Sequence, residues 1–198
     1  MSALQGLVLA GGRSSRMRED KAALTYRRRP QLELAFGLLA PFVSRAFVSV
    51  REDQRGDPLR AGFPQIVDGP DIEGPIAGII AAQAAYPQTA WLVIACDLPM
   101  LDSTTLSELI AGRDASRLAT AFRSASDGLP EPLCAIYEPA SREAILRFVA
   151  GGVSCPRKFL MRHDVALLAP ASPQALANAN TPEELAAARQ TLASRERA

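Results

Sequence analysis

The sequence predicts an α/β protein, a three-layer α/β/α sandwich around a mostly parallel, mixed sheet. Short apolar runs alternate along the chain with segments whose apolar residues recur at helical spacing, and this alternation is typical of parallel sheets covered by helices. A length of 198 residues suits one hydrophobic core and is short for two. Because no internal repeat or low-complexity linker divides the chain, we expect residues 1–198 to form a single domain.

Buried strands are predicted where several apolar residues follow one another between turn residues. Their segments are 6–10, 46–50, 65–67, 91–95, 118–122, 132–137 and 165–168. Helices are predicted from apolar spacing and from start signals, such as Pro75 at a first helical position and Thr181 as an N-cap before Pro182. Their segments are 31–39, 75–86, 103–111, 142–149 and 182–194.

The composition excludes several classes of protein. A net charge of +1 with 22% charged residues argues against a nucleic-acid binder that covers phosphates with lysine and arginine. The first apolar run, 7–10, is far too short to span a membrane. The three cysteines are widely spaced and form no CxxC pair, and His163 is the single histidine. We therefore expect a reduced, cytoplasmic chain without a zinc site.

The loop after the first predicted strand has the composition of a triphosphate-binding loop. Gly11 and Gly12 allow backbone N–H groups to approach phosphate oxygens, and Arg13, Arg16 and Lys21 add cationic donors. The loop matches neither the P-loop pattern GxxxxGK[ST] nor the dinucleotide pattern GxGxxG. From these residues alone, a plain turn with solvated arginines stays an open alternative.

Two aspartates and a glycine are expected at the same sheet edge. Asp97 follows the apolar run 91–95 after Cys96 and is a candidate ligand for Mg²⁺ beside the phosphates, although an aspartate here also suits a turn or a helix cap. Asp68 follows another predicted strand. Gly74 opens a predicted helix whose N–H groups suit a nucleotide, or simply tight packing.

The segment Leu9-Ala10-Gly11-Gly12-Arg13-Ser14-Ser15-Arg16-Met17, followed by Asp20-Lys21-Ala22, resembles the signature LAGGxSxRMGxDKA of the molybdenum cofactor guanylyltransferases. These NTP transferases belong to the nucleotidyltransferases with the Rossmann-like nucleotide-diphospho-sugar transferase fold. The resemblance continues, in the order of that family, through Asp68, 74–78, 95–99 and 178–185.

The resemblance implies a reaction and a set of roles. The enzyme would transfer GMP from GTP to a molybdopterin-type acceptor, form molybdopterin guanine dinucleotide and release pyrophosphate, with Mg²⁺ as cofactor. Asp97 would bind the metal and act in catalysis with Arg16 and Lys21, and Asn178 and Asn180 would bind the acceptor. The nucleotide would be bound by Leu9, Ala10, Gly11, Gly12, Arg13, Lys21, Ser49, Asp68, Gly74 and Asp97.

The sequence departs from the family pattern at three places. Arg18 stands where the signature has glycine, the run Arg27-Arg28-Arg29-Pro30 replaces a Gly-x-Pro turn, and Ser49 replaces a longer amide side chain. These departures put the loop geometry and the contact of Ser49 in question. On the acceptor side, the segment Arg157-Lys158-Phe159 is a candidate for phosphate contacts.

Three alternatives remain. The first is a sister activity on the same fold that uses CTP or a sugar-phosphate acceptor, although Leu9-Ala10-Gly11-Gly12 resembles the guanylyl group more than the cytidylyl pattern LAAG. The second is a non-catalytic nucleotide sensor, and the third is a partner-binding protein without a ligand site. For the favoured function we expect partners that include GTP, the pterin acceptor and molybdoenzyme maturation proteins, but neither nucleic acid nor a membrane.

Overall fold

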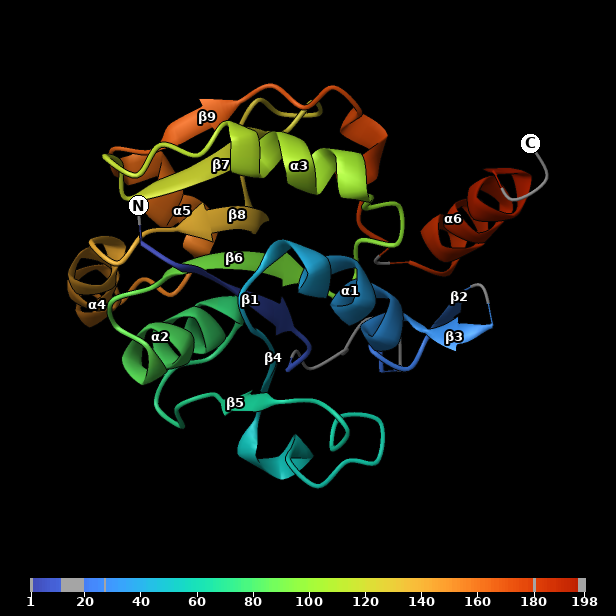
Figure 1. The fold of residues 1–198 in the computed structure, drawn as a ribbon, viewed down its shortest axis with the longest axis horizontal. Helices are drawn as coiled ribbons and strands as arrows, with labels where there is room; N and C mark the ends of the chain where they lie inside the picture. The colour runs from blue at the N-terminus through green and yellow to red at the C-terminus, as the bar shows by residue number, and fades with distance from the viewer. Residues whose placement is uncertain (1, 12–19, 27, 180, 196–198) are drawn as a thin grey trace.

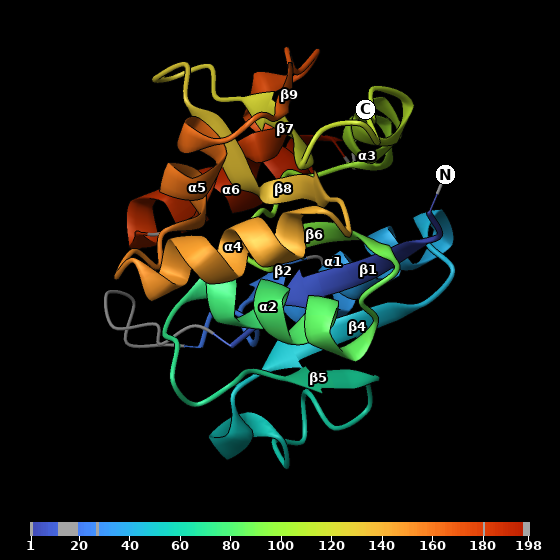
Figure 2. The ribbon, with the colours of Figure 1, turned by 90° about the vertical axis from the view of Figure 1, so that its left-hand side faces the viewer.

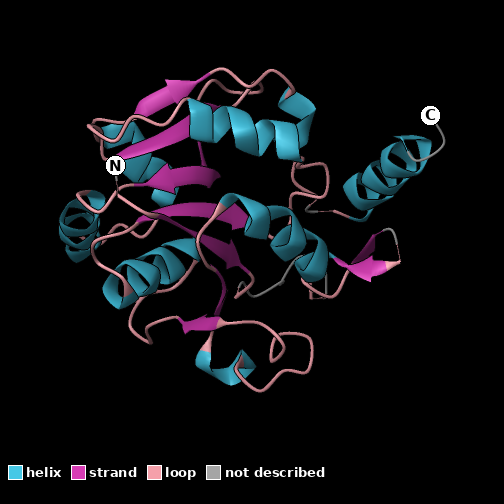
Figure 3. Cartoon of the chain, in the orientation of Figure 1, coloured by secondary structure: helices cyan, strands magenta, loops and turns pink. Residues whose placement is uncertain are grey.

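The computed structural model describes residues 2–11, 20–26, 28–179 and 181–195. Within these residues, a seven-stranded sheet lies between two layers of helices (Figures 1 and 3). The strands, in the sheet order β5-β4-β1-β6-β8-β7-β9, are Gln65–Val67, Ala46–Val50, Leu4–Leu9, Ala90–Ala95, Pro130–Tyr137, Ala119–Arg123 and Ala166–Leu168. Of these, β8 is antiparallel to both of its neighbours, and the other neighbouring pairs are parallel. The mostly parallel, mixed α/β sheet predicted from the sequence is confirmed.

The helices are α1 Gln31–Leu39, α2 Pro75–Ala85, α3 Ser103–Ala111, α4 Ser141–Ala150, α5 Pro156–Arg162 and α6 Pro182–Arg195. Local signals set several of their starts. Pro75 is the first residue of α2, as its fixed φ favours. The Asp102 side chain accepts a hydrogen bond from the Thr105 N–H at 2.9 Å and caps α3. Thr181 and Glu184 form a reciprocal capping box before α6.

The alternation of side chains along the strands divides the core into two parts. On β6, Leu92 and Ile94 pack with α1 and α3, whereas Trp91 and Val93 pack with α2, α4 and α5. Figure 1 shows α1 and α3 in front of the sheet, and Figure 2 shows α2, α4 and α5 together on the other side. The sheet is therefore buried on both faces, as a mostly parallel sheet requires.

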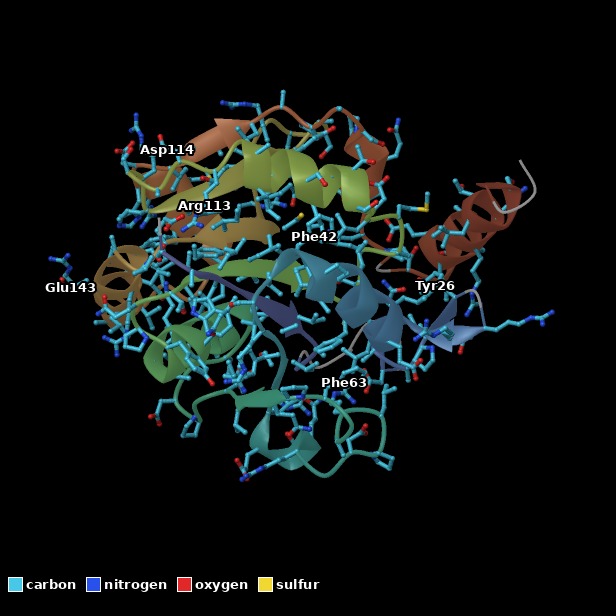
Figure 4. All side chains as sticks on the ribbon, viewed as in Figure 1. Tyr26, Phe42, Phe63, Arg113, Asp114 and Glu143 are labelled. Atoms are coloured by element: carbon cyan, nitrogen blue, oxygen red, sulfur yellow. The ribbon has the colours of Figure 1, made fainter. Side chains whose placement is uncertain are left out.

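The last helix stands apart from these layers (Figure 1). α6 packs on the hairpin formed by β2 (Thr25–Tyr26) and β3 (Arg29–Pro30). The Arg189 guanidinium lies over the Tyr26 ring, 5.7 Å from its centroid, and donates to the Thr25 carbonyl oxygen. Figure 4 labels Tyr26 beside the hairpin. The C-terminal helix thus supports the segment that follows Lys21.

The predicted strands and helices are all present, with ends shifted by at most two residues. The sequence reading missed α5 and the β2–β3 hairpin. α5 has seven residues and each strand of the hairpin has two, so none is long enough to show a period. In the part of the chain that the structure describes, no helix combines the length and apolarity that crossing a membrane requires.

Candidate active site

Four neighbouring parallel strands, β5, β4, β1 and β6, end at one edge of the sheet, and a polar or glycine residue follows each within two positions. These residues are Asp68, Arg51, Gly11 and Asp97. Main-chain hydrogen bonds continue past the strand ends: the Asp68 N–H donates to the Val50 carbonyl at 2.8 Å. The topology thus places the four residues at the crevice where open α/β sheets bind ligands.

A cavity of about 610 Å³ opens at this edge, a size typical of sites for small-molecule ligands. It is lined by all the candidate nucleotide-binding residues that the structure describes, namely Leu9, Ala10, Gly11, Lys21, Ser49, Asp68, Gly74 and Asp97. The structure does not describe the candidates Gly12, Arg13, Arg16 and Asn180, nor the departure Arg18, because they fall in 12–19 or at 180.

An ion pair joins the first loop to the end of β6. Lys21 Nζ lies 2.9 Å from Asp97 Oδ2, and the two side chains are 21% and 17% exposed. The other oxygen of the same carboxylate, Oδ1, is buried and has no hydrogen-bond donor among the described residues. A buried carboxylate oxygen without a donor fits a hard divalent cation.

In its described part, the structure has no group of three or more His, Cys, Asp or Glu side chains placed to hold a metal ion between them. A metal at Asp97 would therefore take most of its oxygens from phosphates and water, as Mg²⁺ commonly does. Cys96, which also lines the cavity, does not supply a nucleophile, because burial raises the pKa of its thiol to about 12.

The second carboxylate, Asp68, is half-buried and lines the same cavity. Ser49 Oγ donates to Asp68 Oδ1 at 2.6 Å. Burial raises the pKa of Asp68 from 3.8 to about 6, against the opposing effects of the Ser49 hydrogen bond and the Arg51 charge. Because the Ser49 hydroxyl already donates its hydrogen bond to Asp68, we expect Ser49 to affect a ligand mainly by orienting this carboxylate.

Two glycines make this arrangement sterically possible. A Cβ on Gly78 of α2 would lie 2.3 Å from Ser49 Oγ, and a Cβ on Gly11 would lie 2.9 Å from Asp68 Oδ2. Any larger residue at either position would force the Ser49–Asp68 pair to move. Glycine at position 11 therefore serves the approach of Asp68 to the first loop.

Sequence reasoning missed two arginines that contact the first loop. Arg51 donates through Nη1 to the Gly11 carbonyl oxygen and is held by a bidentate pair with Asp53. Arg60 donates to the Ala10 carbonyl oxygen at 3.1 Å. The position of Arg51 directly after a strand was a usable signal, whereas no local pattern marks Arg60.

Of the acceptor-side candidates Asn178 and Asn180, the structure describes Asn178, which lies beside the large cavity. Asn178 is exposed and lines a second cavity of about 50 Å³, which shares Leu133 with the first. The next residue, Ala179, donates its N–H to the Asp97 carbonyl oxygen at 3.1 Å. The segment before α6 is therefore hydrogen-bonded to the main chain of Asp97, the candidate metal ligand.

Arg157 and Phe159, from the segment predicted to contact acceptor phosphates, lie in different surroundings. Arg157 lines the smaller cavity, where it pairs with Asp127 and Glu131. Phe159 is fully buried and stacks on His163 with a centroid separation of 4.2 Å. The prediction that Phe159 contacts an acceptor was wrong, because α5 turns this ring into the core.

Comparisons with known proteins show to which family this chain belongs. Residues 6–167 match the family model of the MobA-like NTP transferase domain. The chain belongs to the MobA-like NTP transferase family. It is similar to the molybdenum cofactor guanylyltransferase of Pseudomonas fluorescens, with 33% identity over 90% of each chain.

Two further proteins show the extent of the likeness. The molybdenum cofactor biosynthesis bifunctional protein of Synechocystis is 38% identical over 91% of this chain, which spans about half (52%) of that relative's length. The crystal structure of molybdopterin-guanine dinucleotide biosynthesis protein A from Archaeoglobus fulgidus has a TM-score of 0.81 at 23% identity, over 96% of this chain and 99% of that one. This MobA-like chain is thus a nucleotidyltransferase by family, and a divalent metal requirement is consistent with that family.

Proposed function

We propose that this protein transfers GMP from GTP to a molybdopterin-type acceptor, forming molybdopterin guanine dinucleotide and releasing pyrophosphate. The observation that carries the proposal is the Lys21–Asp97 pair, whose buried Asp97 Oδ1 lacks a donor among the described residues, in a nucleotide-sized cavity. The names of the curated relatives supply the substrates.

The chemistry joins two anions, so the protein must position them and neutralise their charge. A phosphate oxygen of the acceptor attacks the α-phosphorus of GTP, a new P–O bond forms, and the bond to the β-phosphate oxygen breaks to release pyrophosphate. Asp97 would hold Mg²⁺, which when bound draws charge from the phosphates. Lys21, fixed by Asp97 at 2.9 Å, would place its ammonium group against the triphosphate.

The Ser49–Asp68 pair supports GTP as the nucleotide. An ionised carboxylate only accepts hydrogen bonds. Guanine presents two adjacent N–H donors on its Watson–Crick edge, whereas cytosine presents one donor beside an acceptor. Asp68, with Oδ1 held by Ser49 and Oδ2 beside Gly11, would therefore favour guanine over cytosine by chemistry.

On the acceptor side, Asn178 is the described residue that we assign to the pterin. Its neighbour Ala179 is hydrogen-bonded to the main chain of Asp97, so an acceptor bound at Asn178 would approach the α-phosphorus from the α6 side. The role of Asn180, the cytoplasmic location, and contact with molybdoenzyme maturation proteins stay predictions.

A pyrophosphate-release assay tests the proposal. Purified protein is given Mg²⁺, molybdopterin-type acceptor and either GTP, CTP, ATP or UTP, with EDTA in place of Mg²⁺ as the control. We expect release with GTP that requires both acceptor and metal. Faster release with CTP would favour the sister activity, and tight GTP binding without release would favour the nucleotide sensor.

A further inference from the structure

Arg60 is a fully buried charged residue outside the cavity lining. Its side chain is 1% exposed, and it comes from the connection between β4 and β5. Arginine is rarely buried to this extent unless its charge is paired. Here Nη2 lies 2.7 Å from Asp20 Oδ2, and Nη1 lies 3.4 Å from Asp57 Oδ1.

The same Nη2 atom joins two parts of the candidate site. It donates to the Ala10 carbonyl oxygen, directly after β1, and to Asp20, directly before Lys21. The other Asp20 oxygen accepts the Ala22 N–H at 3.0 Å. Both oxygens of Asp20 therefore accept hydrogen bonds, one from Arg60 and one from the N–H of Ala22, the residue that follows Lys21.

We propose that Arg60 is a positioning residue for phosphate binding. It holds Asp20, and through it Lys21, at a fixed separation from Ala10 and Gly11, so that the Lys21 ammonium and the backbone after β1 face the same phosphates. The assignment rests on the proposed function, because it takes the Lys21 side of the cavity as the phosphate side. Arg60 itself touches no substrate.

A buried arginine pair elsewhere in the chain provides the matched control. Arg113 pairs with Glu138, with side chains 8% and 3% exposed, and also donates to Ser2. Figure 4 labels Arg113 beside the N-terminus, at the start of β1 rather than at its end. Loss of either arginine leaves a buried carboxylate or carbonyl without its donor and lowers stability. Of the two substitutions, only the one at Arg60 should also weaken phosphate binding.

The experiment compares Arg60→Met with Arg113→Met at a temperature where both are folded, judged by circular dichroism. Calorimetry measures the binding of GTP, guanosine and inorganic tripolyphosphate in the presence of Mg²⁺. We expect Arg60→Met to lose at least about tenfold in affinity for GTP and tripolyphosphate, because a displaced Lys21 would lose about one charged hydrogen bond to the phosphates. Guanosine affinity should stay within about twofold. Arg113→Met should bind all three probes like the unmodified protein.

Equal losses for GTP and guanosine, or no loss in folded Arg60→Met, would overturn the positioning role. If that variant does not fold, Asp20→Asn, at a side chain that is 38% exposed, replaces it; it keeps Arg60 and should show the same selective loss at smaller size. Its failure to do so would equally contradict the proposal. An unmodified protein that binds tripolyphosphate but not GTP would refute the proposed function and leave the Arg60 assignment intact.

Discussion

The cavity contains two carboxylates that follow parallel strands in the same way but lie in different surroundings. Asp97, after β6, pairs with Lys21 and keeps one buried oxygen without a donor among the described residues. Asp68, after β5, is hydrogen-bonded to the neutral Ser49, and burial raises its pKa to about 6. Two aspartates at the same edge of the sheet thus differ in their partners and in their acidity.

The difference indicates separate tasks. A carboxylate beside an ammonium group is suited to a site of concentrated charge, such as a metal and a triphosphate. A half-buried carboxylate hydrogen-bonded to a hydroxyl group is suited to accept N–H groups from an uncharged nucleobase. We expect changes at Asp97 to affect turnover and changes at Asp68 to affect the choice and affinity of the nucleotide.

The largest effect is expected from Asp97→Ala. Loss of a group that stabilises transition-state charge typically lowers the rate by about a hundredfold or more, roughly 3 kcal/mol. We expect such a loss in turnover at limiting Mg²⁺, with the fold retained, and a similar loss for Lys21→Ala. Steady-state pyrophosphate release measures both.

The control for this comparison is Glu143→Ala, at an exposed residue of α4 that Figure 4 labels at the far left. It should turn over like the unmodified protein. Near-normal turnover of Asp97→Ala under the same conditions would remove the metal assignment.

A smaller effect is expected from pH at Asp68. Guanosine is the suitable ligand, because it lacks the titrating phosphates of GTP. Since the pKa of Asp68 is raised to about 6 and the ionised form accepts the base, guanosine affinity should fall about tenfold per pH unit below that value. Asp68→Asn should bind guanosine weakly and show no such pH dependence between pH 7.5 and 5. A steep dependence that survives in Asp68→Asn would assign the titration to another group.

The same carboxylate has a predictable effect on stability without ligand. The folded-state pKa of Asp68 lies above the ordinary value of 3.8. The protonated Asp68 therefore contributes to the free energy of unfolding, and this contribution is fully present below pH 3.8. The contribution is lost as pH rises through about 6. Asp68→Asn removes this dependence, which urea unfolding at several pH values can measure.

The smallest effect is expected at Arg28, in the turn between β2 and β3, where a change should leave both carboxylates unaffected. Arg28 has φ of 61°, a conformation that favours glycine, and it stands where the Gly-x-Pro turn has its glycine. Arg28→Gly relieves roughly 1 kcal/mol of strain but also gains entropy in the unfolded chain. We expect a stabilisation below about 1 kcal/mol in thermal unfolding, with unchanged turnover. Arg28→Ala, which keeps the strain, should give no gain; an equal gain from alanine would mean that the backbone conformation is not the cause.

The sequence by itself determined the order of strands and helices and the residues at the strand ends. The signals that predict these elements each act over a few residues, so a short stretch of sequence reveals them. Examples are the apolar runs 46–50 and 91–95, the proline at the start of α2 and the Thr181 cap. Because parallel strands end at one edge, the sequence also indicated that Gly11, Asp68 and Asp97 would line one cavity.

Only the tertiary structure decided how these groups are held. The contacts of Arg60 with Ala10 and of Ser49 with Asp68 join residues 50 and 19 positions apart, and the burial of Phe159 depends on the face that a seven-residue helix turns to the core. Such contacts follow from the packing of loops and helices against the sheet. No spacing of residue types along the chain specifies them.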